Sequence, residues 1–124
     1  MGMIEKKLRL AGSLGERETL CLFDSGASVS CIRPDIARDL ARPISLHKPF
    51  RISTADEKTF MEVQEQVFLE FYIDDFLLFS DFFLVPGLTE EAIIGALTLQ
   101  QWRLKLDFDR EEVIVDPRAV RLRI

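Results

Sequence analysis

The chain has 124 residues, 48% of them hydrophobic, and a formal net charge of −5. These values are typical of one globular domain with a hydrophobic core, and they exclude a disordered chain. Acidic and basic residues are interspersed without the basic stripe of nucleic-acid-binding proteins, and no apolar stretch reaches membrane-spanning length. We therefore expect a single domain over residues 1–124, cytoplasmic, with neither nucleic acid nor membrane as a partner.

The first half of the chain alternates apolar and polar residues with a period of two, which predicts strands. Residues 8–10 and 19–23 indicate two strands joined by a turn at residues 12–15. Residues 34–41 then carry apolar side chains at helical spacing, behind a proline suited to a first helical turn. This pattern predicts a short helix that ends before Pro43.

Strands resume in the second half, from about Phe50. Every second residue of 67–73 is apolar, and residues 76–85 form a strongly apolar partner across a turn at Asp74 and Asp75. Residues 97–102 indicate a second short helix, and a final hairpin follows it. The sequence therefore predicts an all-β fold with one or two short helices.

The chain contains few cysteine and histidine residues, the side chains that most often bind zinc. Cys21 and Cys31 are the only cysteines and His47 is the only histidine, so no zinc set can be assembled from them. We expect two buried thiols that behave as small apolar residues.

Asp24 follows an apolar strand and precedes three small residues. An Asp-Ser-Gly tripeptide is by itself an ordinary turn former, because Gly adopts positive φ and Asp bonds its own backbone. Three features favour a functional site instead. Residues 20–23 are apolar on both faces and should carry Asp24 to the heart of the fold, and residues 26–28 leave space beside the carboxylate. Residues 93–95 form a second strand–glycine segment, which should pass beneath the acid.

These segments resemble the retropepsin-like aspartic proteases. The chain has Asp24-Ser25-Gly26-Ala27-Ser28 in its first half, and Ile93-Ile94-Gly95-Ala96 before a short helix in its second half. The match covers nearly the whole chain. The resemblance implies a closed β-barrel of the acid-protease fold, hydrolysis of peptide bonds, and no metal or organic cofactor.

By this resemblance Asp24 is the catalytic acid, and Ser25 supplies the hydroxyl that braces two paired loops. Gly26 lets those loops approach each other, and Ala27 lines the base of the substrate groove. Ser28 either bonds near the acid or is a plain strand-edge hydroxyl. The strand that threads the loop consists of Ile93, Ile94 and Gly95.

Aspartic-protease chemistry needs two carboxyl groups that share one proton. The chain contains a single Asp-Ser/Thr-Gly sequence, at Asp24. The second acid must therefore come from another copy, which predicts a homodimer with Asp24 and its symmetry mate on the two-fold axis. The two carboxyl groups are expected to titrate as a coupled pair.

Residues 51–61 lie where the resemblance places the flap, a hairpin that closes over an extended peptide or protein substrate. Its tip is formed by Thr54, Ala55, Asp56, Glu57 and Lys58. Many relatives carry a glycine there, but none occurs between Gly26 and Gly87, so an exposed hairpin without a catalytic part is the alternative. Residues 120–124 alternate apolar residues with arginines, which predicts a terminal strand that either pairs across the dimer or faces solvent.

The function that the resemblance implies is an aspartic endopeptidase acting through a dyad formed across the dimer. The alternative from another class is a catalytically silent module of the same fold that dimerises or binds peptides. The intact Asp24-Ser25-Gly26 favours the enzyme, because a purely structural dimer could do without an acid that is costly to bury beside its twin.

Overall fold

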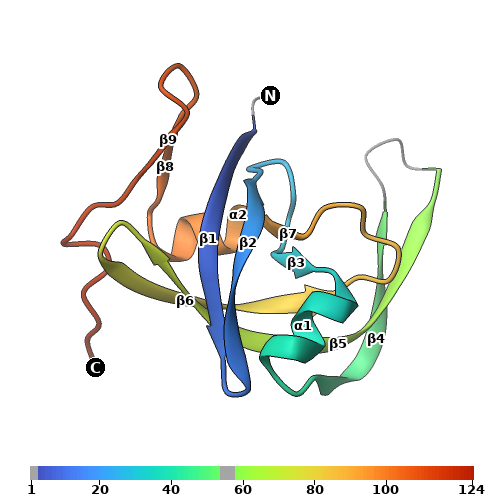
Figure 1. The fold of residues 1–124 in the computed structure, drawn as a ribbon. Coiled ribbons are helices and arrows are strands. Elements are labelled where there is room, and N and C mark those ends of the chain that lie inside the picture. The colour runs from blue at the N-terminus through green and yellow to red at the C-terminus, as the bar shows by residue number, and fades with distance from the viewer. Residues whose placement is uncertain (1–2, 54–57) are drawn as a thin grey trace.

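The computed structural model describes residues 3–53 and 58–124, and its chain begins with the hairpin of β1 (Ile4–Gly12) and β2 (Gly15–Phe23) (Figure 1). The tight turn of this hairpin packs on the end of the first helix, where the backbone N–H of Leu14 donates to the carbonyl oxygen of Leu40 at 2.9 Å. A Cβ atom on Gly12 would collide with that same carbonyl group. Only glycine fits this close approach of two backbones.

The remaining elements follow in chain order. They are β3 (Cys31–Ile32), α1 (Pro34–Leu40), β4 (Ile44–Ser53), β5 (Phe60–Ile73), β6 (Phe76–Leu84), β7 (Ala92–Ile94), α2 (Ala96–Gln101), β8 (Lys105–Asp107) and β9 (Glu112–Ile114). The main sheet has the order β1-β2-β7-β3-β6-β5-β4, and pairing of Leu10 on β1 with Phe71 on β5 closes six of its strands into a barrel. The predicted all-β barrel with two short helices is confirmed.

The barrel interior holds the hydrophobic core. Phe23, Phe71 and Phe82 are among its largest fully buried side chains. The predicted alternation along β5 is confirmed, since the apolar residues at every second position from 67 to 73 are buried. Helix α1 begins with Pro34 in its first turn, as predicted, and packs its apolar face into the same core.

Strand β4 begins at Ile44, earlier than the sequence pattern indicated. Its side chains are mostly exposed, so no alternation marks it, and Pro49 interrupts it. A proline is tolerated here because, among the described strands, β4 pairs with β5 alone and the register shifts between Ser45 and Phe50. Together β4 and the first part of β5 form an arm that extends at the right of Figure 1.

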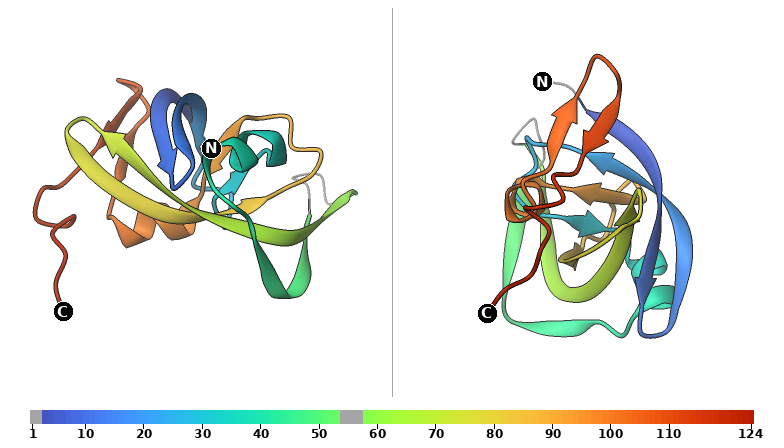
Figure 2. Two further views of the ribbon diagram at one scale, coloured as in Figure 1. Left: turned by 60° about the horizontal axis from the view of Figure 1, so that its bottom comes forward. Right: turned by 90° about the vertical axis from the view of Figure 1, so that its left-hand side faces the viewer.

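Strands β8 and β9 form a separate hairpin after α2. Figures 1 and 2 place this hairpin beside the N-terminal end of β1, apart from the arm of β4 and β5. The predicted terminal strand is wrong for the single chain, because residues 120–124, all within the described part, adopt no strand. A strand needs a hydrogen-bonding neighbour, and none of the strands in the described residues pairs with this segment.

Candidate active site

The loop that carries Asp24 begins directly after β2. The backbone N–H of Asp24 donates to the carbonyl oxygen of Ile94 at 3.0 Å, which extends the parallel pairing of β2 with β7 by one step. The Asp24 carboxylate accepts the backbone N–H of Gly26 at 2.8 Å, and the Asp24 carbonyl oxygen accepts that of Ala27 at 3.1 Å. These two bonds fold the chain into a tight turn with the acid at its start.

The expectation that Asp24 lies at the heart of the fold is wrong for the single chain. Residues 20–23 of β2 are apolar on both faces, but of these only Cys21 and Phe23 are buried in the core, whereas Leu20 is exposed. Asp24 itself is half-buried, and Ser25 and Gly26 are exposed. The tip of the loop therefore lies at the surface of the chain.

The strand–glycine segment lies directly beside this loop. The backbone N–H of Ala96 donates to the Ala27 carbonyl oxygen at 2.7 Å, and that of Leu97 donates to the Ser28 carbonyl oxygen at 3.2 Å. Directly before these two donors, a Cβ atom on Gly95 would lie 2.8 Å from the Ala27 carbonyl oxygen and still nearer to that of Val29. Glycine is required at this crossing of two backbones.

A small apolar cluster connects the loop to the arm of β4 and β5. Val29 and Ile93, both half-buried, pack with Ile52 of β4 and Met61 of β5 around the buried core of this cluster. The structure thus brings the strand beside the loop and the base of the predicted flap into one apolar surface. Of the predicted flap tip, Thr54, Ala55, Asp56 and Glu57 lie outside the described residues, and Lys58 is exposed.

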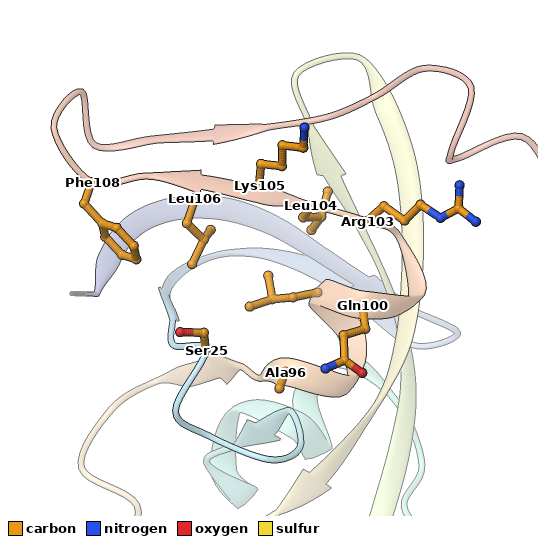
Figure 3. A pocket seen from close by; sticks show the side chains of 9 residues that line it. Ser25, Ala96, Gln100, Arg103, Leu104, Lys105, Leu106 and Phe108 are labelled. Atoms are coloured by element: carbon orange, nitrogen blue, oxygen red, sulfur yellow. The ribbon is translucent and has the colours of Figure 1, made fainter. Parts of the chain in front are cut away.

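An open groove of about 630 Å³ adjoins the loop on its other side (Figure 3). Ser25 faces Leu106 and Phe108 across this groove, whereas Arg103 and Lys105 direct their charged ends away from it. Its apolar lining comes from α2 and from residues 104–108, which contain the first strand of the final hairpin. The sequence signal for it was the alternation of Leu104, Leu106 and Phe108, which had indicated only a hairpin.

Asp24 is the single acid in an Asp-Ser/Thr-Gly sequence of this chain. Within residues 3–53 and 58–124, no cluster of three or more histidine, cysteine or acidic side chains could hold a metal ion. No helix in these ranges is long and apolar enough to span a membrane.

Burial is the main cause of the raised pKa values of the two thiols. It raises the pKa of Cys21 to about 12, with a further contribution from the negative charge of Glu91, and the pKa of Cys31 to about 11. Both cysteines are free and buried, as the sequence predicted. Neither carries an activated thiolate, so neither has the properties of a nucleophile.

Comparison with solved structures assigns the class of the fold. The chain superposes on the crystal structure of the retroviral protease-like domain of Ddi1 from Leishmania major with a TM-score of 0.67. The alignment has 14% sequence identity and covers 94% of this chain and 90% of the other. No protein-family model matches the chain, and no curated protein sequence is significantly similar to it.

The fold is therefore retropepsin-like, as the sequence predicted.

Proposed function

We propose that this chain is an aspartic endopeptidase whose active site is completed by a second copy of the chain. The observation that carries the proposal is the position of Asp24. Its carboxylate lies at the start of a loop held by backbone hydrogen bonds to β7 and α2, and the tip of that loop is exposed. A surface position allows the loops of two chains to meet with one acid each.

The groove beside Ser25 supports a second copy as the partner. Apolar side chains line it next to the loop, among them Phe108, which is 44% exposed in the single chain. Covering such side chains removes apolar surface from water, at about 25 cal/mol for each Å². A two-fold axis through this region would bring the two Asp24 carboxyl groups together.

In the dimer, two neighbouring carboxyl groups cannot both be ionised, so they share one proton. The ionised carboxylate takes a proton from water while the water oxygen bonds to the peptide carbonyl carbon. The protonated carboxyl donates its hydrogen bond to the carbonyl oxygen, where negative charge develops. The C–N bond then breaks as the leaving amine accepts a proton, and no covalent intermediate with the protein forms.

The substrate of this site is an extended peptide. The arm of β4 and β5 has a free strand edge, because β4 pairs only with β5 within the described sheet. Main-chain hydrogen bonds to such an edge bind peptides of many sequences, and the side-chain pockets decide between them. The apolar surface of Val29, Ile52, Met61 and Ile93 favours apolar side chains next to the cleaved bond.

Hydrolysis of a peptide library from acid to neutral pH tests the proposal. We expect cleavage by the wild type and loss of about three orders of magnitude or more in kcat for Asp24→Asn, which keeps the shape but cannot share a proton. Asp75→Asn is the matched control, because Asp75 lies in the exposed turn between β5 and β6. Equal cleavage by wild type and Asp24→Asn would show that Asp24 takes no part in catalysis.

The second candidate is a non-cleaving module that binds peptides or dimerises. It is favoured by the absence of glycine between Gly26 and Gly87, which includes the predicted flap tip. The same library decides between the two. A dimer that retains extended peptides without cutting any of them is this module and not an enzyme.

A further inference from the structure

Three buried hydroxyl groups from three different elements meet beneath the Asp24 loop. They belong to Ser30 before β3, Ser80 on β6 and Thr98 on α2, with exposed fractions of 2%, 8% and 2%. The Thr98 hydroxyl lies 2.6 Å from that of Ser30 and 2.8 Å from that of Ser80. A buried hydroxyl lowers the stability of the fold unless it is hydrogen-bonded. These three hydroxyls satisfy one another and form one hydrogen-bonded unit.

One arrangement of the protons makes every hydrogen bond of this unit at once. Each hydroxyl has one proton to donate. Ser80 donates to the carbonyl oxygen of Asp81 at 3.0 Å, so its oxygen must accept from Thr98. Thr98 must then accept from Ser30, whose oxygen in turn accepts the backbone N–H of Gly95 at 3.1 Å. The result is a continuous chain of donors from Gly95 to Asp81, in which each bond polarises the next.

The first donor of this chain lies between the bonds that hold the Asp24 loop. Gly95 is flanked by Ile94, which accepts the N–H of Asp24, and by Ala96, which donates to Ala27. At the other end of the loop, the carbonyl oxygen of Ser30 accepts the N–H of Phe83 on β6 at 3.0 Å. The hydroxyl chain and this backbone bond together tie both sides of the loop–strand crossing to β6.

A second bond fixes α2 to that strand. The indole N–H of Trp102 donates to the Phe79 carbonyl oxygen at 2.8 Å, one residue before Ser80. Helix α2 is thus attached to β6 at two points, through Thr98 within the helix and through Trp102, the residue that follows it. With α2 fixed, the hydroxyl chain links Thr98 to the backbone N–H of Gly95, beside the direct backbone bonds from Ala96 and Leu97 to the loop.

We propose that Ser30, Thr98 and Ser80 are positioning residues that hold the Asp24 loop in one conformation through this directed chain of hydroxyl groups. The catalytic consequence rests on the proposed function, whereas the ordering of the loop does not. Without the Thr98 hydroxyl, the proton of Ser30 has no acceptor and the oxygen of Ser80 has no donor. The crossing at Gly95 then opens more often, and the two acids of a dimer align for a smaller fraction of the time.

Thr98→Val tests this, because it removes the hydroxyl and keeps the branched shape. Thr98→Ser restores the hydroxyl and is the rescue. Thr19→Val is the matched control, since Thr19 is 1% exposed on β2 and its hydroxyl donates only to the Arg17 carbonyl oxygen, at 3.2 Å. Amide hydrogen exchange, measured by NMR, reports on the loop directly, and peptide hydrolysis reports on the acid.

In Thr98→Val we expect the amides of Asp24, Gly95 and Ala96 to exchange about tenfold faster than in Thr19→Val, which corresponds to one lost hydrogen bond. We expect kcat to fall about tenfold with KM unchanged, and Thr98→Ser to restore both values. Equal exchange of these amides in Thr98→Val and Thr19→Val would overturn the proposal, as would faster exchange with an undiminished kcat in an active enzyme. Faster exchange in a protein that cleaves no peptide would refute the proposed function and leave the positioning role intact.

Discussion

The backbone N–H of Asp24 donates a 3.0 Å hydrogen bond to the carbonyl oxygen of Ile94, although the two residues lie in opposite halves of the chain. The position of the acid is thus determined by a strand formed much later in the sequence. Bonds from Ala96 to Ala27 and from Leu97 to Ser28 continue the same contact around Gly95. The stability of this crossing should decide whether the loop keeps its shape.

Gly95→Ala should therefore destabilise the fold strongly. The added Cβ would lie 2.8 Å from the Ala27 carbonyl oxygen. This is a backbone atom, and it can move away only if the hydrogen bonds between the loop and residues 94–97 break. We expect a decrease of about 3 kcal/mol in the free energy of unfolding, measured by urea denaturation. Gly15→Ala is the control, since its nearest new contact is the Asp39 carbonyl oxygen at an ordinary 3.6 Å. Equal losses in the two variants would contradict the close approach at Gly95.

The two thiols should make the fold sensitive to alkaline pH. Burial raises the pKa of Cys21 from 9.0 to about 12 and that of Cys31 from 9.0 to about 11. Below pH 9 both states keep their thiol protons, whereas above it the unfolded chain loses them first, so the free energy of unfolding falls with rising pH.

Denaturation of the wild type and of Cys21→Ala/Cys31→Ala at several pH values above 9 measures this contribution. We expect the variant to lose stability with a shallower slope, whatever its stability at neutral pH. The thiols of the native wild type should also resist alkylation at about pH 8, because almost no thiolate is present. Parallel slopes in the two proteins would contradict the shifted pKa values.

If the groove beside Ser25 is part of the dimer interface, a charge placed in it should weaken the dimer. Phe108→Asp should leave the fold intact, because this side chain is already 44% exposed, but would place a charge in the proposed interface. We expect the dissociation constant of the dimer to rise about 100-fold or more, measured by sedimentation. Leu77→Asp is the control, because Leu77 is 47% exposed on β6 and does not line the groove. Dimers of equal strength in both variants would exclude this groove from the interface.

The elements that the sequence predicted correctly are those in which one face is buried. Alternation from residue 67 to residue 73 and helical spacing after Pro34 are direct consequences of packing against one core, so they are visible in the chain itself. Strand β4 has no such signature, because it is an edge strand with exposed side chains and a proline.

The candidate site was predictable only in part, for a related physical reason. The Asp24 loop and the segment 93–95 could be recognised, because close backbone crossings require glycine and small residues. The surface position of Asp24 could not, because Leu20 and Leu22 give β2 an apolar outer face like that of a fully buried strand. The contact of the hydroxyls beneath the loop could not be predicted either, since only the barrel topology joins β3, β6 and α2.

In the proposed enzyme, each chain supplies one half of the catalytic dyad. The rate of peptide cleavage by a fixed amount of wild type, measured with increasing amounts of Asp24→Asn, tests it most directly. With about nine parts of Asp24→Asn, random pairing leaves roughly a tenth of the wild-type chains with a wild-type partner, and the rate should fall accordingly. A rate unchanged by the excess of Asp24→Asn would show that one chain works alone and would contradict the account.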